Sequence, residues 1–340
     1  MLGLKIPKSQ ADCVRRILLN HELINLEWKI KRSDDYVLIP LIQEPGKDVF
    51  DEIDLPDLEM VDTVFEAHKK SPNSLKGYLK GQIDPVKIDE IKKSFDIIGD
   101  VVILEIPEEL ESEKYLIAEA ALKFTKRKSV YRKTSEIKGV IRTRTLEHLA
   151  GEDISETIHI EYGSRFLLDV RKVYFSPRLA TERERIVSQV TDGEVIIDLF
   201  TGVGPYSVSI ARRHKVEIFA VDINPDAIYY LKRNIELNKL EGRILPVLND
   251  AHEFLRDNNV KANRIIMNLP GTACKYLEDA IKCLKNGGVL HYYEFATDSR
   301  IPIQRIKEKS NGRRIAILDV RKVKSSSPGK WHMGIDAVIH

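Results

Sequence analysis

The feature that most constrains the fold is a regular alternation of strand-like and helix-like segments that begins near residue 172. Short apolar runs typical of buried strands cover 195–199, 216–221, 243–248, 264–268 and 289–295. Segments with helical spacing lie between them, for example at 226–238 and 273–284. Because parallel strands need crossover helices, this order predicts an α/β domain with a doubly wound, mostly parallel sheet. Two more strand-like segments, 315–323 and 332–339, are expected to close it as an edge hairpin.

The first half of the chain predicts two smaller α+β domains. The total of 340 residues exceeds what a single core usually holds, so more than one domain is expected. The first of the two has helical spacing at 10–21 and a short strand at 36–40. A stretch rich in Pro, Asn, Ser and Gly at 68–77 has the composition of a linker.

The middle part of the chain combines strands with one helix. A strand-like run covers 95–106, with a bend or bulge expected at Gly99-Asp100. A glutamate-rich helix follows Pro107, and residues 157–161 and 164–170 alternate as antiparallel strands do. We therefore expect three domains, namely a small N-terminal α/β domain at 1–65, a middle α+β domain at 72–168 and a Rossmann-type catalytic domain at 169–340.

The charge of the chain limits how it can bind nucleic acid. The net charge is only +2, so any such contact depends on a local patch of cations. Between residues 123 and 144, nine lysines and arginines accompany a single acid, Glu136. We expect this basic stretch to contact RNA phosphates, although an ordinary solvated surface has the same composition. The cations expected to bind RNA are Lys126, Arg127, Lys128, Arg132, Lys133 and Arg144.

Cysteine usage and hydropathy exclude several classes of protein. Cys13, Cys274 and Cys283 are widely scattered and form no CxxC pair or other metal-ligand spacing. Free thiols in a reducing cytoplasm are the expected state, and no metal is expected. No run approaches 18 apolar residues, so we expect neither a membrane span nor a membrane partner.

The strongest local motif is VIIDLFTGVGP at 195–205, a buried strand that runs into a glycine turn and then a helix. Gly202 and Gly204 would let the backbone approach a ligand where a Cβ would collide. Ser207 stands where a dinucleotide fingerprint has its third glycine, and Pro205 removes one amide donor. The turn therefore suits a zwitterionic amino-acid group better than a pyrophosphate.

Acidic residues follow the next two strands. Asp222 ends the second strand and can bind two ribose hydroxyls, and Asp250 follows the third and can accept a hydrogen bond from an adenine amino group. Asp198, Asp222 and Asp250 lie 24 and 28 residues apart. This combination is typical of class I methyltransferases that use S-adenosyl-L-methionine (AdoMet), with Phe200, Ile223 and Ala251 beside the cofactor. A Rossmann-type domain that holds another nucleotide is the alternative.

The fourth strand ends in Asn268-Leu-Pro-Gly, which bears on the substrate. Methyltransferases that act on exocyclic amines usually carry Asn/Asp-Pro-Pro-aromatic at this position. An endocyclic ring nitrogen is therefore the expected target.

With these motifs, nearly the whole chain resembles a known family, the archaeal and eukaryotic tRNA (guanine-N1)-methyltransferases that modify the guanosine 3′ of the anticodon. The resemblance rests on RTRTLEHLAG at 142–151, KVYFSPR at 172–178, Glu182-Arg183, DLFTGVGP at 198–205 and Asn268-Leu-Pro. The stretch KSSSPGK at 324–330 departs from the family, which has an aromatic residue before the Ser-Pro. The resemblance implies a three-domain monomer that binds tRNA through its N-terminal and middle domains.

The resemblance also implies roles for individual residues. Guanine N1 carries a proton at neutral pH, so its methylation needs a general base, and Glu182 takes that position. Arg142 would stabilise the charge that develops on O6, and Asn268 would orient the base. Tyr174 and Arg183 would line the cofactor pocket. Without the resemblance, Glu182-Arg183 fits a solvated helix face better, and Arg142 could be one more phosphate contact.

Three functions compete at this stage. The first is tRNA N1-guanine methylation. The second is transfer of the aminocarboxypropyl group of AdoMet in wybutosine biosynthesis, or an added methylation of a tricyclic wybutosine intermediate by the same enzyme. The pairing of Glu182 with Asn268-Leu-Pro favours methyl transfer over the aminocarboxypropyl reaction. The third is a catalytically silent RNA-binding module, which is disfavoured because every cofactor and acid–base position is filled.

Overall fold

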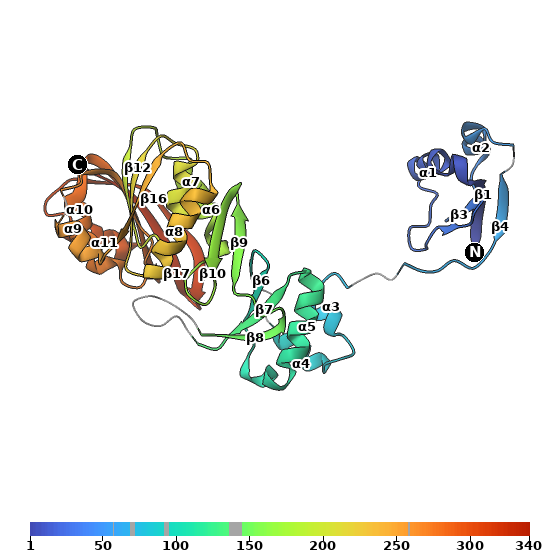
Figure 1. Ribbon diagram of the computed structural model, residues 1–340, viewed down its shortest axis with the longest axis horizontal. Helices are drawn as coiled ribbons and strands as arrows, with labels where there is room; N and C mark the ends of the chain where they lie inside the picture. Colours follow the sequence, from blue (N-terminus) through green and yellow to red (C-terminus); the bar gives the residue numbers. More distant parts are fainter. Residues whose placement is uncertain (57, 69–71, 92–94, 136–144, 258) are drawn as a thin grey trace. The chain divides into compact units, whose positions relative to one another are not determined.

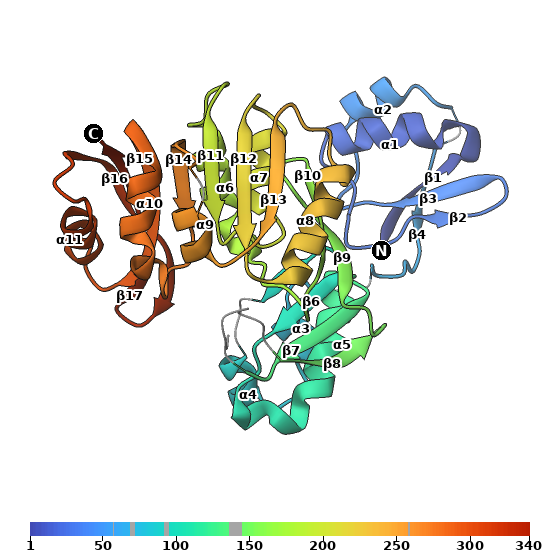
Figure 2. The same ribbon diagram turned by 60° about the vertical axis from the view of Figure 1, so that its left-hand side comes forward.

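The structure is a computed structural model that describes residues 1–56, 58–68, 72–91, 95–135, 145–257 and 259–340. The chain divides into two compact units, Met1–Pro72 and Asn73–His340. Each unit has its own hydrophobic core, and Figures 1 and 2 show their elements.

The first unit is a small antiparallel sheet covered by two helices. Its strands, in the order β2-β3-β1-β4, are β1 (Leu2–Pro7), β2 (Lys31–Arg32), β3 (Tyr36–Pro40) and β4 (Glu59–Asp62). Its helices are η1 (Lys8–Gln10, 3-10), α1 (Ala11–Asn20) and α2 (Lys47–Ile53). Val14 and Leu18 of α1 are buried in one cluster with Leu4 and Ile39 of the sheet. The helix expected at 10–21 and the strand at 36–40 are therefore confirmed.

The first part of the second unit is a four-stranded sheet with helices. The strands, in the order β5-β6-β7-β8, are β5 (Asp96–Ile98), β6 (Val101–Leu104), β7 (Ser129–Lys133) and β8 (Leu146–Gly151). The helices are α3 (Leu75–Leu79), α4 (Pro85–Glu90), η2 (Glu108–Glu113, 3-10) and α5 (Lys114–Thr125). Apolar residues of α3 and α5 share one core with β6, β7 and β8.

Two details here differ from the sequence-based expectation. The run at 95–106 is an antiparallel hairpin of β5 and β6, because the backbone turns at Gly99 with a φ of +53°. A Cβ at Gly99 would come 2.5 Å from the carbonyl oxygen of Ile158, so the turn needs a glycine. The expected linker at 68–77 overlaps helix α3. Ser74 caps the N-terminus of this helix, because its hydroxyl accepts a hydrogen bond from the Gly77 amide.

A hairpin of β9 (Glu156–Glu161) and β10 (Ser164–Asp169) packs against helix α8 (Pro225–Leu237). The side chain of Asn234 donates to the carbonyl of Leu167 at 3.1 Å and accepts from its amide at 2.7 Å. Asn238 makes the same pair of bonds to Arg165, at 2.8 and 2.9 Å. Two asparagine side chains one helical turn apart thus form hydrogen bonds with the outer backbone edge of β10, as a neighbouring strand would. These bonds attach the hairpin to the large sheet domain.

The large sheet has seven strands in the order β13-β12-β11-β14-β15-β17-β16 (Figure 2). They are β11 (Val195–Leu199), β12 (Glu217–Asp222), β13 (Arg243–Leu248), β14 (Ala262–Met267), β15 (Leu284–Ala296), β16 (Ile315–Ser327) and β17 (Lys330–Ile339). The first five are parallel, and β17 and β16 close the edge as an antiparallel hairpin. This confirms the expected α/β fold with its mostly parallel sheet and edge hairpin.

Helices cover both faces of this sheet. They are η3 (Pro177–Leu179, 3-10), α6 (Ala180–Val187), α7 (Pro205–Ala211), α8, α9 (Ala251–Asp257), η4 (Ala273–Lys275, 3-10), α10 (Leu277–Cys283) and α11 (Arg300–Lys309). Ile196 of β11 packs in one core with α6, α7 and α8, and its neighbour Ile197 packs in another with α9, α10 and α11. Alternate side chains of the strand thus face opposite layers.

The cysteines and the lengths of the helices can be compared with the expectations from the sequence. Cys13, Cys274 and Cys283 are all free thiols. Among the described residues, no helix is long and apolar enough to cross a membrane.

Candidate active site

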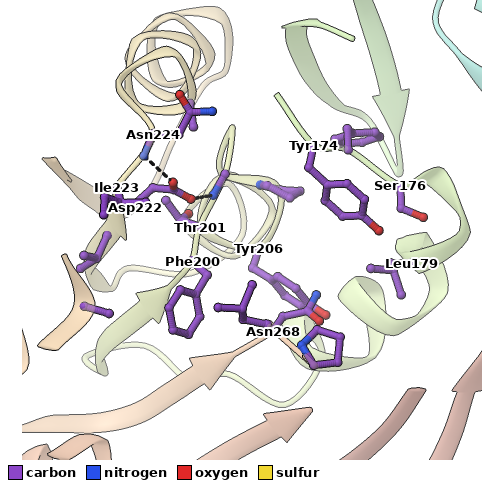
Figure 3. Close-up of a pocket in the computed structure, with 18 of the residues that line it drawn as sticks. Tyr174, Ser176, Leu179, Phe200, Thr201, Tyr206, Asp222, Ile223, Asn224 and Asn268 are labelled. Atoms are coloured by element: carbon purple, nitrogen blue, oxygen red, sulfur yellow. Dashed lines mark hydrogen bonds between the residues drawn. The ribbon is translucent and has the colours of Figure 1, made fainter. Parts of the chain in front are cut away.

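A cavity opens where β11, β12, β13 and β14 end, which is where parallel α/β sheets bind ligands (Figure 3). Its empty space is about 1160 Å³, counting the open mouth. The sequence-predicted residues on its wall are Tyr174, Arg183, Phe200, Gly202, Asp222, Ile223, Asp250, Ala251 and Asn268. They come from segments up to 94 residues apart, and the parallel sheet brings their strand ends to one edge.

The two glycines of the turn have different surroundings. Gly202, with a φ of +58°, lines the cavity, and the nearest atom to a Cβ there would be the Tyr174 carbonyl oxygen at 3.8 Å. Gly204, with a φ of +83°, is not among the residues that line the cavity, and a Cβ there would collide with Leu231 of α8. Gly202 therefore leaves room for a ligand, whereas Gly204 allows α8 to pack closely.

Asp198 holds the turn from beneath and does not reach the described cavity wall. It accepts hydrogen bonds from the hydroxyls of Thr201 at 2.8 Å and Ser207 at 2.6 Å. Burial raises the pKa of Asp198 to about 6, against the effect of these two hydroxyls. Ser207 thus replaces the third glycine of a dinucleotide motif with a side chain that fixes the turn.

Asp222 links the first two strand ends. Its Oδ2 accepts the Gly202 amide at 2.7 Å and its Oδ1 accepts the Asn224 amide at 2.9 Å (Figure 3). Burial raises the pKa of Asp222 above its ordinary value, and these backbone donors oppose the shift. Asn224 then caps α8 by accepting the Asp226 amide at 3.0 Å. The carboxylate is therefore fixed at the cavity wall, where it can bind a diol.

The wall beside the third strand end is apolar and aromatic. The Phe200 and Tyr276 rings meet edge to face at 5.1 Å, and His252 packs on Tyr276 at 4.2 Å. Phe200 has a φ of +65°, a conformation that non-glycine residues adopt rarely. Asp250 accepts the His252 amide at 2.8 Å and so starts α9. A flat ring beside two carboxylates and an open glycine turn is what AdoMet requires, so the residues present fit it.

Arg183 lines the same cavity although it is only 3% exposed. Its guanidinium donates to both oxygens of Glu161, at 2.8 and 2.6 Å, and to the Ser176 carbonyl at 3.0 Å. It also lies 5.2 Å from the Phe175 ring centre. Its charge is thus balanced by the β9–β10 hairpin, and it acts on the cavity by fixing segment 174–179.

Glu182 lies on α6, is 7% exposed, and is not among the described residues that line the cavity. The Tyr293 hydroxyl donates to its Oε1 at 2.5 Å. The Tyr293 hydroxyl also accepts from the Tyr206 hydroxyl at 3.5 Å, and Tyr206 does line the cavity. Burial raises the pKa of Glu182 above its ordinary value, against hydrogen bonds from Tyr293 and Arg185. Glu182 is therefore a buried carboxylate one layer behind the cavity wall, and not a solvated helix face.

The residues expected to bind RNA fall into three groups. Arg144 lies outside the described residues, as do Arg142, expected to stabilise the charge on O6, and Glu136, the one acid of the basic stretch. Lys126, Arg127 and Lys128 are exposed at the end of α5, and Lys128 pairs with Asp100 at 3.0 Å.

Arg132 and Lys133, in contrast, are paired with acidic residues. Arg132 donates to Glu111 and Glu147, and Lys133 lies 3.5 Å from Asp96. Both side chains are 15% exposed. Among the described cations expected to bind RNA, those at 126–128 are therefore the more accessible to phosphate.

Several residues around the site were not singled out from the sequence. The cavity wall also includes Thr201, Tyr206, Asn224, Tyr276, Phe295, Lys324 and His332. Arg185 contacts Glu182 from three residues further along α6. Residues at this spacing on a helix are neighbours, so the sequence could have predicted this pair. Arg321 of β16 also contacts Glu182, and Asp336 of β17 contacts Arg321. These contacts depend on the register of the two strands of the edge hairpin, which the sequence does not show.

Family models match three consecutive parts of the chain. They are described as the tRNA methyltransferase 5 N-terminal domain at residues 3–50, the TYW2 N-terminal domain at 75–154 and the TRM5/TYW2 methyltransferase domain at 157–318. The last begins at the β9–β10 hairpin, which packs on the large sheet domain.

Known proteins and solved structures resemble the chain over most or all of its length. It is 41% identical to the tRNA (guanine(37)-N(1))-methyltransferase Trm5b of Pyrococcus abyssi, over 98% of each chain. It is 36% identical to a tRNA(Phe) (4-demethylwyosine(37)-C(7)) aminocarboxypropyltransferase of Methanocaldococcus jannaschii, over 71% of this chain and 95% of that one. The solved complex of aTrm5 and tRNALeu has a TM-score of 0.81 at 39% identity, over 100% of each chain. The chain therefore belongs to the Trm5 family of AdoMet-dependent tRNA (guanine(37)-N(1))-methyltransferases.

Proposed function

We propose that this protein transfers a methyl group from AdoMet to N1 of the guanosine at position 37 of tRNA, with Glu182 as the general base. The observation that carries the assignment of the base is the burial of Glu182 directly behind the cavity wall, next to Arg183, which lines it. A carboxylate in this setting has a pKa above the ordinary value of 4.5, as a proton acceptor that works near neutral pH needs.

The cofactor would be held by residues of three strand ends. Asp222 would bind the ribose hydroxyls, Gly202 would leave room for the amino-acid group, and Asp250 would face the adenine amino group between Phe200 and Tyr276. When bound, AdoMet supplies a methyl group on a positively charged sulfur. The apolar wall excludes water from that group, which favours transfer to the base over hydrolysis.

The target base would be oriented by Asn268 and activated by two charged side chains. Asn268 directly follows β14 and lines the cavity, where its amide can both donate to and accept from the edge of a guanine. Glu182 would take the proton from N1, which leaves negative charge on O6. The resemblance assigns Arg142 to stabilise that charge, a role we retain as part of the proposal.

The RNA would be held outside the cavity by the exposed cations Lys126, Arg127 and Lys128. We further propose that the protein works as a monomer, as the family resemblance implies, and in the cytoplasm, as its scattered free cysteines indicate. The acid–base chemistry needs no metal, and the described residues contain no cluster of three or more His, Cys, Asp or Glu suited to hold one.

The second candidate is the aminocarboxypropyl transfer of wybutosine biosynthesis. The match of residues 75–154 to the TYW2 N-terminal domain favours it. The alignment with the relative of that activity covers 71% of this chain, whereas the alignment with the Trm5b relative covers 98%. Full-length similarity therefore favours methylation.

Mass spectrometry of nucleosides from tRNA incubated with the protein and AdoMet tests the proposal. We expect the guanosine at position 37 to gain one methyl group, and N1 to be its site. A gain of an aminocarboxypropyl group would support the second candidate. If the tRNA stays unmodified, both candidates are contradicted, and the protein would be an RNA-binding protein without catalytic activity.

A further inference from the structure

Glu182 is held by cations from two elements. Arg185, on the same helix, donates through Nε to Oε2 at 3.1 Å and through Nη2 to Oε1 at 2.9 Å. Arg321, on edge strand β16, donates through Nη2 to Oε1 at 2.5 Å and through Nε to Oε2 at 3.0 Å. Both carboxylate oxygens are thus held in a two-sided contact, the geometry that orients a carboxylate most strongly.

A second buried acid holds both arginines in turn. Asp336 of β17 is 1% exposed, and it accepts from Arg185 Nη1 at 2.6 Å and from Arg321 Nη2 at 3.1 Å. His291 of β15 hydrogen-bonds the same carboxylate at 2.7 Å. Burial lowers the pKa of His291, so it adds no charge near neutral pH. Two cations and two anions therefore balance in the cluster while Glu182 is ionised.

Arg321 has a further partner that Arg185 lacks. Its Nη1 donates to Asp319, a half-exposed residue of the same strand, at 2.9 Å. When Glu182 takes up a proton, the charge of Arg321 is still balanced by Asp319 and Asp336. The cluster can therefore accommodate both protonation states of Glu182 without leaving a buried cation unpaired.

We propose that Arg321 and Arg185, aligned by Asp336, are positioning residues that hold Glu182 ionised and oriented for proton transfer. This inference rests on the proposed function, in which Glu182 is the base. It gives the edge hairpin a part in the reaction, because Arg321 and Asp336 come from its two strands.

Every charged or titratable group around Glu182 bears on the pH at which it ionises. These groups are Arg183 and Arg185 of α6, Tyr206 of α7, His291 and Tyr293 of β15, Asp319 and Arg321 of β16, and Asp336 of β17. Arg185 and Arg321 favour the ionised form, whereas Asp336 favours the protonated form. Substitutions at Arg321 and Asp336 should therefore shift the ionisation in opposite directions.

The test is the pH dependence of single-turnover methylation with saturating tRNA and AdoMet. The rate should rise with pH as Glu182 ionises, and this part of the rate–pH profile is its rising limb. In Arg321→Gln, loss of a cation should move the rising limb to higher pH by about one unit, as for a carboxyl that loses a neighbouring arginine. Arg321→Lys should restore most of the wild-type profile. Asp336→Asn keeps the shape and should move the limb to lower pH.

A matched control is Arg213→Gln. Arg213 makes a two-sided pair with Glu184 on the same helix α6, both bonds at 2.6 Å, and this pair does not include Glu182. Its loss should leave the limb in place. AdoMet affinity and thermal unfolding of each variant show whether it is folded.

The possible results separate this inference from the proposed function. If Arg321→Gln slows the reaction equally at every pH, Arg321 only packs the hairpin, and the inference is overturned while Glu182 remains the base. If the limb persists in Glu182→Gln, it belongs to another group, and both assignments fail together. Opposite shifts in Arg321→Gln and Asp336→Asn, with no limb in Glu182→Gln, would support both.

Discussion

Arg183 and Glu161 form a buried, two-sided ion pair between helix α6 and the β9–β10 hairpin, with bonds of 2.8 and 2.6 Å. The pair joins a wall of the cavity to a hairpin that precedes the large sheet in the sequence. The hairpin is therefore a structural support of the active site and not only a connection between domains.

We expect Glu161→Gln to lower the free energy of unfolding by about 3 kcal/mol near neutral pH, because it leaves the buried Arg183 without a counter-charge. Burial by itself would raise the pKa of Glu161, but His159 and Arg183 hold it below the ordinary value of 4.5. The stabilisation is thus complete above that value and is lost as pH falls through the lowered pKa. Denaturant unfolding at several pH values measures this. A difference between wild type and variant that grows in acid would contradict the assignment.

Asp222→Ala should weaken AdoMet binding by about 2 kcal/mol, since a hydrogen-bonded carboxylate at the ribose position is lost. Because Asp222 also accepts the Gly202 amide, part of this loss reflects the glycine turn itself. Calorimetric titration with AdoMet gives the affinity directly. Unchanged affinity in a folded variant would rule out Asp222 as a cofactor ligand.

Replacing Lys126, Arg127 and Lys128 by glutamine should weaken tRNA binding and reduce its salt dependence. Each lost phosphate contact removes roughly 0.7–0.9 from the slope of log affinity against log salt. Exposed cations of α11, namely Arg300, Lys307 and Lys309, provide a matched triple control. AdoMet affinity should be the same in both triples. If log tRNA affinity depends equally on log salt in the two triple variants, residues 126–128 are an ordinary solvated surface.

Much of the fold could be predicted because each strand of the large sheet is a continuous apolar run. The strand Val195–Leu199 was predicted to the residue, and the acids at the strand ends follow from the same pattern. At Gly99 the sequence predicted only a bend or bulge within one strand. The full hairpin turn was not predicted, because its need for a glycine comes from Ile158, a contact that sequence does not show.

The residues that would bind the cofactor were also easier to predict from the sequence than the residues around the proposed general base, Glu182. Asp222 and Gly202 lie on a motif that is continuous in sequence. The partners of Glu182 lie up to 139 residues away, and Arg321 reaches it only through the register of β16 against β17. Charge alone could not separate Arg132, which pairs with Glu111 and Glu147, from the exposed Arg127.

The central claim is that Glu182 removes the N1 proton, and Glu182→Gln tests it most directly. Glutamine keeps the shape and can still accept a hydrogen bond from Tyr293, but it cannot take up a proton. Binding of tRNA and AdoMet should be nearly intact, because the interaction matters mainly in the transition state.

The deciding measurement is the single-turnover rate of methyl transfer by wild type and Glu182→Gln across a range of pH. We predict that the variant is slower by roughly 10²–10⁴-fold, the usual contribution of a positioned base. The wild-type rate should rise with pH until Glu182 is ionised, and this rise should be absent in the variant. A variant with a near-normal rate would show that the proton leaves by another route, and Glu182 would then be a structural member of its buried cluster.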